Sequence, residues 1–232
     1  RYFIQAEQEL KNSPVELHQQ KVPHAPEHIT WLTDNLPEGA RVGVDGWLIS
    51  AGHRDFLRNR LSKGQLQLRA DVDLITPIWS DRPGLPSASI FELPVAYAGV
   101  DRKEKLKLLR EDLHELGADS FLITTLDDIA WTLNIRATDV DFNPVCLSYL
   151  IIDQEQAYWC VDDERVSKSL KKTLAADQIS IHEYQEVEQQ LLALPADARI
   201  AVEVGDRGLA RRRRQEGRVV AVERGIELTQ RG

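Results

Sequence analysis

The sequence predicts an α/β protein with a mixed β-sheet flanked by helices. Short apolar runs at 121–125, 157–161 and 199–204 have the length and composition of buried strands. Segments with apolar residues at helical intervals separate these runs, and that alternation is typical of a sheet with helices on its faces. No repeat with the period of a solenoid is visible in the sequence.

The best-defined helix is expected from Asp101 to Gly117. Asp101 can cap its first turn, and Glu104 follows at the spacing of a capping box. Leucines at helical intervals supply an apolar face, and Gly117 suits the first position after the helix end. Further helices are expected at 1–20 (broken near Pro14), 28–36, 51–63, 167–176 and 187–194, and further strands at 41–45, 66–74, 129–135, 146–152 and 179–182.

Four prolines between Pro77 and Pro94 predict a stiff connection between two domains. We therefore place the domain limits at 1–95 and 96–205, with residues 206–232 as a tail. The tail contains four consecutive arginines, 211–214. A solvated, mobile terminus is one reading and a nucleic-acid patch is another, although no interleaved aromatic residue is present to stack on bases. A third reading is that the tail is not native sequence.

Composition excludes several classes of protein. The formal net charge of −8 argues against a nucleic-acid partner, and no apolar run approaches the roughly 18 residues of a membrane helix. The start Arg1-Tyr2-Phe3 does not resemble a signal peptide, so we expect a cytoplasmic protein without a membrane partner. Cys146 and Cys160 read as buried free thiols, with a disulfide as the alternative.

Polar residues are concentrated between two predicted strands, and we expect them on an exposed rim because buried polar groups each need a partner. This loop supplies the candidate site residues: Asn134, Arg136, Asp139, Asp141 and Asn143.

Arg136 has two interpretations. It can pair with a peptide carboxylate or an aspartate of a partner, or it can form a local salt bridge to Asp139 or Asp141. The pair Asp127-Asp128 likewise suits acid/base chemistry, but turn hydrogen bonds at the entry to the next strand are the more ordinary role.

No catalytic or metal-binding residue is predicted in this chain. The sequence contains neither a Gly-x-Ser-x-Gly elbow nor a phosphate-binding loop, which disfavours a nucleotide-binding α/β protein. His24 and His28 are four residues apart, but Pro23 and Pro26 oppose a helix through both, and a third metal ligand is missing.

Four segments carry a resemblance to a known family. They are RYFIQA at 1–6, LPEGARVGVD at 36–45, IWSDRP at 78–83, and DDIAW at 127–131 through Asn143-Pro144. In this order they resemble the aminopeptidase P (Xaa-Pro aminopeptidase) branch of the creatinase/prolidase-like metallopeptidases. One departure is Ala137, where the family usually has glycine, so the loop is expected to bend differently.

The resemblance is to the non-catalytic N-terminal region of that family. It implies a creatinase-like domain from residue 96, preceded by the C-terminal portion of a second similar domain. It also implies a loop that faces the catalytic cleft, two divalent metal ions (Mn or Zn) held by a separate catalytic domain, a proline-containing peptide substrate and a homo-oligomer.

The resemblance thus predicts a region that contributes to substrate access and subunit contacts in an Xaa-Pro aminopeptidase. The alternative is a stand-alone binding or assembly module with the same fold and no enzymatic activity.

Overall fold

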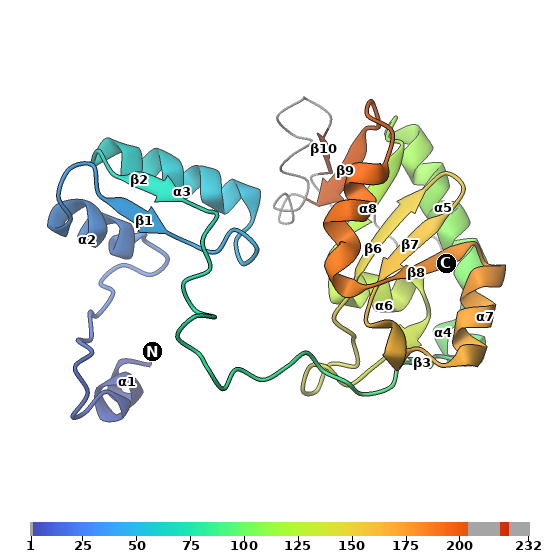
Figure 1. Cartoon of the computed structure of the whole chain (residues 1–232), viewed down its shortest axis with the longest axis horizontal. Helices are drawn as coiled ribbons and strands as arrows, with labels where there is room; N and C mark the ends of the chain where they lie inside the picture. Colours follow the sequence, from blue (N-terminus) through green and yellow to red (C-terminus); the bar gives the residue numbers. More distant parts are fainter. Residues whose placement is uncertain (1, 204–218, 223–232) are drawn as a thin grey trace. The chain divides into compact units, whose positions relative to one another are not determined.

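The computed structural model describes residues 2–203 and 219–222, which divide into two compact units (Figure 1). The first unit comprises residues up to 45 together with 54–72, and the second comprises 46–53 and the chain from 73 onward. The domain limits expected at residues 95 and 205 stay predictions.

The first unit contains a small parallel sheet and short helices. Its elements are α1 (Phe3–Glu9), α2 (Glu27–Asn35), β1 (Arg41–Gly43), most of α3 (Ala51–Lys63) and β2 (Gln67–Arg69). Strand β1 pairs with β2 in parallel, and Gly39 allows the turn before β1 with a φ of +80°. Ile29, Leu57 and Leu61 are buried.

The proline-rich segment contains little regular structure, as expected. Only β3 (Phe91–Glu92) and α4 (Val95–Ala98) form between residues 73 and 101. Strand β3 pairs antiparallel with β5 (Ile135–Arg136), so this segment is anchored to the loop that contains the predicted site.

Helix α5 (Arg102–Glu115) begins and ends as the sequence predicts. The side chain of Asp101 accepts a hydrogen bond from the Glu104 backbone N–H at 2.9 Å, and Gly117 has a φ of +61° just after the helix. Leu106, Leu109 and Leu113 are almost completely buried.

A six-stranded mixed sheet forms the centre of the second unit, in the order β10-β9-β4-β6-β7-β8 (Figure 1). The strands are β4 (Ser120–Ile123), β6 (Tyr149–Asp153), β7 (Ala157–Cys160), β8 (Ile179–His182), β9 (Ile200–Glu203) and β10 (Val219–Val222). Strands β10, β9 and β4 are parallel, β6 is antiparallel to both β4 and β7, and β8 is parallel to β7. The predicted α/β fold with a mixed sheet is confirmed.

Helices cover both faces of this sheet. One face packs against α5, α6 (Leu126–Thr132) and α7 (Lys168–Ala176), and Trp159 is fully buried there. The other face packs against α8 (Val187–Ala193), which follows the short helix η2 (Tyr184–Glu186). A second short helix, η1 (Asp163–Arg165), connects β7 to α7. Alternate strand residues thus enter the two halves of the core.

Two sequence-based expectations are wrong. The strand expected at 129–135 is mostly helix, because α6 occupies Leu126–Thr132 and only β5 is extended. Trp131 is accordingly a half-buried helical residue and not a strand residue of the core. A mobile terminus, one of the three readings of the tail, does not apply to residues 219–222, because β10 pairs with β9. The arginine run 211–214 lies outside the described residues.

Candidate functional site

The polar loop predicted as the functional site begins at the carboxyl end of α6 and continues to β6. Asn134 follows the helix, Arg136 lies in β5, and Asp139, Asp141 and Asn143 come after it. The five predicted residues occupy one continuous stretch of chain, but they differ widely in exposure and in their partners.

Three cationic side chains converge on the carboxyl end of α6. The last carbonyls of a helix lack partners within it, and this end carries the negative pole of the helix dipole. Each cation donates to a backbone carbonyl at this end over 2.7–2.8 Å: Lys105 to Trp131, Arg136 to Ala130 and Arg102 to Leu133. The cations therefore satisfy and neutralise the end of the helix.

Lys105 is the most buried of these cations, with 1% of its surface exposed. Its Nζ donates to Asn134 Oδ1 at 2.5 Å and lies 4.0 Å from the centroid of the Trp131 ring. Burial and, secondarily, the positive charge of Arg136 lower the pKa of Lys105 to about 8, while Asp101 opposes the shift. Lys105 thus links α5 to α6, and its ammonium group releases its proton at a lower pH than that of an exposed lysine.

Asn134 is buried and helps to end α6. Its φ is +50°, in the left-handed region that asparagine tolerates better than most residues, and its Nδ2 donates to the Val100 carbonyl at 3.0 Å. The expectation that Asn134 lies on an exposed rim is wrong, because its amide is satisfied inside the protein.

Asp139 is also buried, with its side chain fully covered. Its carboxylate accepts two hydrogen bonds from the Arg165 guanidinium, one of them at 2.9 Å, and a third from the Leu147 backbone N–H at 2.7 Å. The exposed rim predicted for Asp139 is therefore wrong as well. This pair fixes the base of the loop to η1.

Arg136 does not form the local salt bridge that was one of its two interpretations. Within residues 2–203, neither Asp139 nor Asp141 is its ion-pair partner. Its Nη1 instead donates to the carbonyls of Ala130 and Ile135 at 2.8 and 2.7 Å, and the side chain is half-buried.

The tip of the loop is exposed. The backbone N–H of Asn143 donates to the Val140 carbonyl at 3.1 Å, and this bond closes a four-residue turn. The side chain of Asn143 donates to Asp127 at 3.3 Å. Asp141 is exposed, and Phe142 is fully exposed with a φ of +63°. The sequence reasoning missed Phe142, although an aromatic residue between Asp and Asn-Pro in a turn could have drawn attention.

The pair Asp127-Asp128 lies in the first turn of α6. Carboxylates are favourable there because they face the positive pole of the helix dipole. The ordinary interpretation, a role at the entry to the next element, is compatible with this position, but that element is a helix and not the expected strand.

The described residues do not fit a metal centre. They contain no group of three or more His, Cys, Asp or Glu side chains that could hold an ion, so a two-metal site is not assigned to this part of the chain. Cys146 and Cys160 are buried free thiols, as predicted, and burial raises the pKa of Cys160 to about 12.

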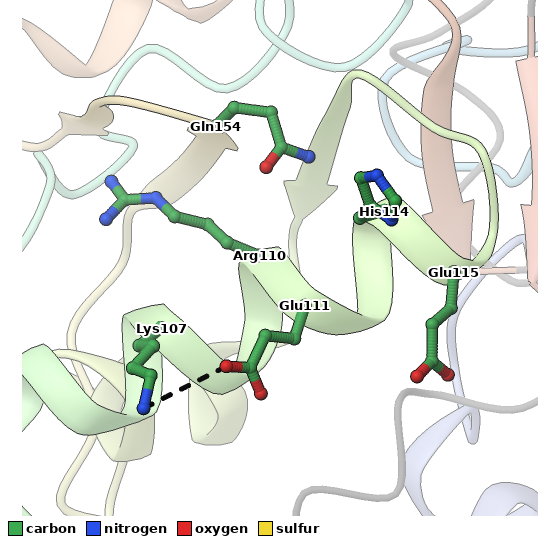
Figure 2. Close-up of a pocket in the computed structure, with 6 residues that line it drawn as sticks. All are labelled: Lys107, Arg110, Glu111, His114, Glu115 and Gln154. Atoms are coloured by element: carbon green, nitrogen blue, oxygen red, sulfur yellow. Dashed lines mark ion pairs between the residues drawn. The ribbon is translucent and has the colours of Figure 1, made fainter.

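A shallow depression of about 520 Å³ lies along α5 and is lined by none of the predicted site residues (Figure 2). Its lining residues carry mixed charges: Lys107, Arg110, Glu111, His114, Glu115 and Gln154. Lys107 pairs with Glu111 at 3.9 Å, and Figure 2 shows Arg110 and Glu115 pointing away from each other. Nothing converges on one ligand position, so the loop remains the candidate site.

Comparison with known sequences places the chain in a family. The model of the creatinase/prolidase N-terminal domain matches residues 81–224. The chain belongs to this family. The four sequence segments resemble aminopeptidase P. The names of the chain's relatives, given below, confirm this resemblance.

Two of these relatives are aminopeptidase P2 of Arabidopsis thaliana and Xaa-Pro aminopeptidase 1 of Dictyostelium discoideum. The chain is 36% and 33% identical to them over 84% and 82% of its length. The match covers only 28% and 32% of the relatives, so the chain spans about a third of their length.

Comparison with a solved structure also matches the chain to part of an X-prolyl aminopeptidase. The fold is similar to a crystal structure of X-prolyl aminopeptidase from Caenorhabditis elegans, with a TM-score of 0.84 and 26% sequence identity. The match covers 95% of this chain and 37% of that one. The nematode protein is described as a cytosolic enzyme with a di-nuclear active site.

Proposed function

We propose that this chain is the non-catalytic N-terminal region of a metal-dependent Xaa-Pro aminopeptidase. The observation that carries the proposal is its similarity, over more than four fifths of its length, to about a third of such enzymes. The lack of a metal-ligand group among the described residues is compatible with this role, since the two ions of a di-nuclear site would be held elsewhere in the polypeptide.

The parent enzyme would release an N-terminal residue that precedes proline, and Mn or Zn ions would activate the attacking water in its catalytic domain. A cytoplasmic location is supported by the nematode relative, and a homo-oligomer remains part of the proposal. No helix in the described part of the chain is long and apolar enough to cross a bilayer.

Within the enzyme, this region would contribute to substrate access and subunit contacts through its polar loop. The contacts of the candidate residues support two different roles. Asn134, Arg136 and Asp139 bond to the protein itself and would hold the loop in place. Asp141 is exposed at the tip and would be available to a substrate or a partner, whereas Asn143 is half-buried and its side chain is bonded to Asp127.

The proposal is tested with the longest polypeptide that the gene encodes. We expect this protein to cleave a dipeptide or tripeptide with proline at the second position, to lose activity in EDTA and to regain it with Mn²⁺ or Zn²⁺. A matched peptide with alanine in place of the proline should be a poor substrate. Absence of Xaa-Pro cleavage would instead favour the stand-alone binding or assembly module.

A further inference from the structure

Residues 73–82 form a turn that exposes large apolar side chains. Leu74, Ile75, Ile78 and Trp79 lie within this apolar turn, and each of them is between 45% and 78% exposed. Burial of such side chains is a main source of folding free energy, and most of that free energy is not gained here. Single exposed apolar residues are ordinary on a protein surface, whereas a group of this size within one turn indicates a contact surface.

The apolar turn is held in shape by hydrogen bonds of its own. Asp73 Oδ1 accepts from the backbone N–H groups of Ile75 and Thr76 at 3.0 and 2.9 Å. The Ile75 carbonyl accepts from the backbone N–H groups of Ile78 and Trp79 at 3.0 and 3.1 Å, which closes one helical turn. These backbone bonds fix the turn without any contribution from the exposed apolar side chains.

Arg82 positions the tryptophan ring of the turn. Its Nη1 donates to Thr76 Oγ1 at 2.8 Å, and its guanidinium lies 5.6 Å from the centroid of the Trp79 ring. The backbone N–H of Arg82 donates to the Trp79 carbonyl at 3.2 Å. A partner would therefore meet an apolar surface that is already ordered, and little conformational entropy would be lost on contact.

The charges of the apolar turn disfavour a membrane as its partner. Interfacial anchors combine apolar residues with several lysines or arginines, which attract anionic lipids. Residues 73–82 contain a single cation, Arg82, which already contacts Thr76 and Trp79, and two carboxylates, Asp73 and Asp81. The turn therefore lacks the basic charge of a membrane-binding segment.

The length of the relatives indicates what covers the apolar turn. The matches to the Arabidopsis and Dictyostelium aminopeptidases cover 28% and 32% of those proteins, so about two thirds of such a polypeptide lies outside this chain. A second copy of the chain is a less favourable partner, because its formal net charge of −8 opposes self-association.

We infer that the apolar turn is a docking surface for the remaining part of the same polypeptide, the portion of the enzyme outside residues 1–232. Leu74, Ile78 and Trp79 would enter an apolar depression in that part, and the exposed Asp81 would face positive charge at its rim. The contact would use residues that the polar loop does not include. This inference rests on the proposed function, because it takes the partner from the enzyme to which the chain is assigned.

The reactivity of an introduced thiol tests this contact. Ile78→Cys is prepared in the 232-residue chain and in the longest polypeptide that the gene encodes, and alkylation by iodoacetamide is followed by peptide mass spectrometry. In the chain, the thiol should react as an exposed cysteine does. In the longer polypeptide it should react about tenfold or more slowly, because a covered thiol reacts only when the contact opens. Cys146 and Cys160 are buried and add little background.

Two further variants control the measurement. Leu74→Cys is a second probe of the same turn and should be protected in the same way. Ile4→Cys is the matched control, because Ile4 is 72% exposed in α1, and its thiol should react at rates within about twofold in the two polypeptides. Protection of Ile78→Cys without any Xaa-Pro cleavage by the longer polypeptide would show that the contact exists and that the proposed activity is wrong.

Other outcomes would overturn the inference. Equal alkylation rates of Ile78→Cys in the two polypeptides would show that the turn is not covered, and equal slowing of Ile4→Cys would show that protection is not specific to the turn. Slow alkylation of the 232-residue chain itself would place the cover within the chain or, if dilution relieved it, in a second copy. Protection only by vesicles that contain phosphatidylserine would assign the turn to a membrane.

Discussion

Asp139 and Arg165 form a two-pronged ion pair in the interior of the second unit, with side-chain exposures of 0% and 3%. Removal of one partner would leave the other charge buried without compensation. We expect Asp139→Ala to lower the free energy of unfolding by about 3–5 kcal/mol, measured by urea denaturation. Asp141→Ala, at an exposed site two residues away, should change it by less than about 0.5 kcal/mol. Equal effects of the two changes would show that the base of the loop is not held by this pair.

Lys105 should make stability depend on alkaline pH. Its pKa is about 8 in the folded protein, below its ordinary value of 10.5, so between these values the unfolded chain binds the proton more strongly. The contribution of Lys105 to the free energy of unfolding should therefore rise as pH increases from about 8 to 10, by on the order of 1–3 kcal/mol.

Lys105→Met is the reference for this measurement. Buried groups such as Cys146 and Cys160 have raised pKa values and oppose the trend, because the unfolded chain releases their protons first. These contributions are common to both proteins and cancel in the difference. The wild type should gain stability relative to Lys105→Met as pH rises, and a flat or falling difference would contradict a depressed lysine pKa.

Trp131 should contribute less to stability than a core tryptophan. Its ring is half-buried and packs against Lys105, so Trp131→Ala should cost about 1–3 kcal/mol. Trp159 is fully buried, and Trp159→Ala should cost about 3–5 kcal/mol. Guanidinium melts measure both losses. If Trp131→Ala destabilised the protein more than Trp159→Ala, a half-buried position of Trp131 in α6 would be contradicted.

Arg136→Ala tests the cationic end of α6. The change removes the hydrogen bonds to the Ala130 and Ile135 carbonyls and should lower the free energy of unfolding by about 1 kcal/mol. It also removes a positive charge near Lys105, so the pKa of Lys105 should rise. The alkaline pH dependence of stability would then move to higher pH in this variant. An unchanged pH profile would show that the charge of Arg136 does not affect the pKa of Lys105.

Local signals explain which parts of the fold were predictable. Helix α5 has a cap at Asp101, leucines at helical intervals and a terminal Gly117, all within one segment. Helix α6 has only seven residues, and its isoleucine, tryptophan and threonine favour a strand locally. Its end is stabilised by Lys105 and Arg102, which come from another helix, and no local pattern reveals such support.

The candidate site was predictable in position and less so in detail. The density of polar residues located the loop, but burial of Asp139 depends on Arg165, which is 26 residues away in sequence. Burial of Asn134 similarly depends on Val100 and Lys105. Exposure of Phe142 is the opposite case, since its hydrophobicity predicts burial but its side chain is fully exposed at the tip of the loop.

The most direct test of the account is turnover by the purified 232-residue chain itself. The chain is incubated with an Xaa-Pro peptide and Mn²⁺ or Zn²⁺, and release of the N-terminal residue is compared with a protein-free blank and with the longest polypeptide of the same gene. We expect the blank rate for the chain and metal-dependent cleavage for the longer polypeptide, because residues 2–203 and 219–222 contain no group of side chains that could hold a metal ion and so activate water. Metal-dependent turnover by the chain that survives repurification would contradict the assignment of this region as non-catalytic.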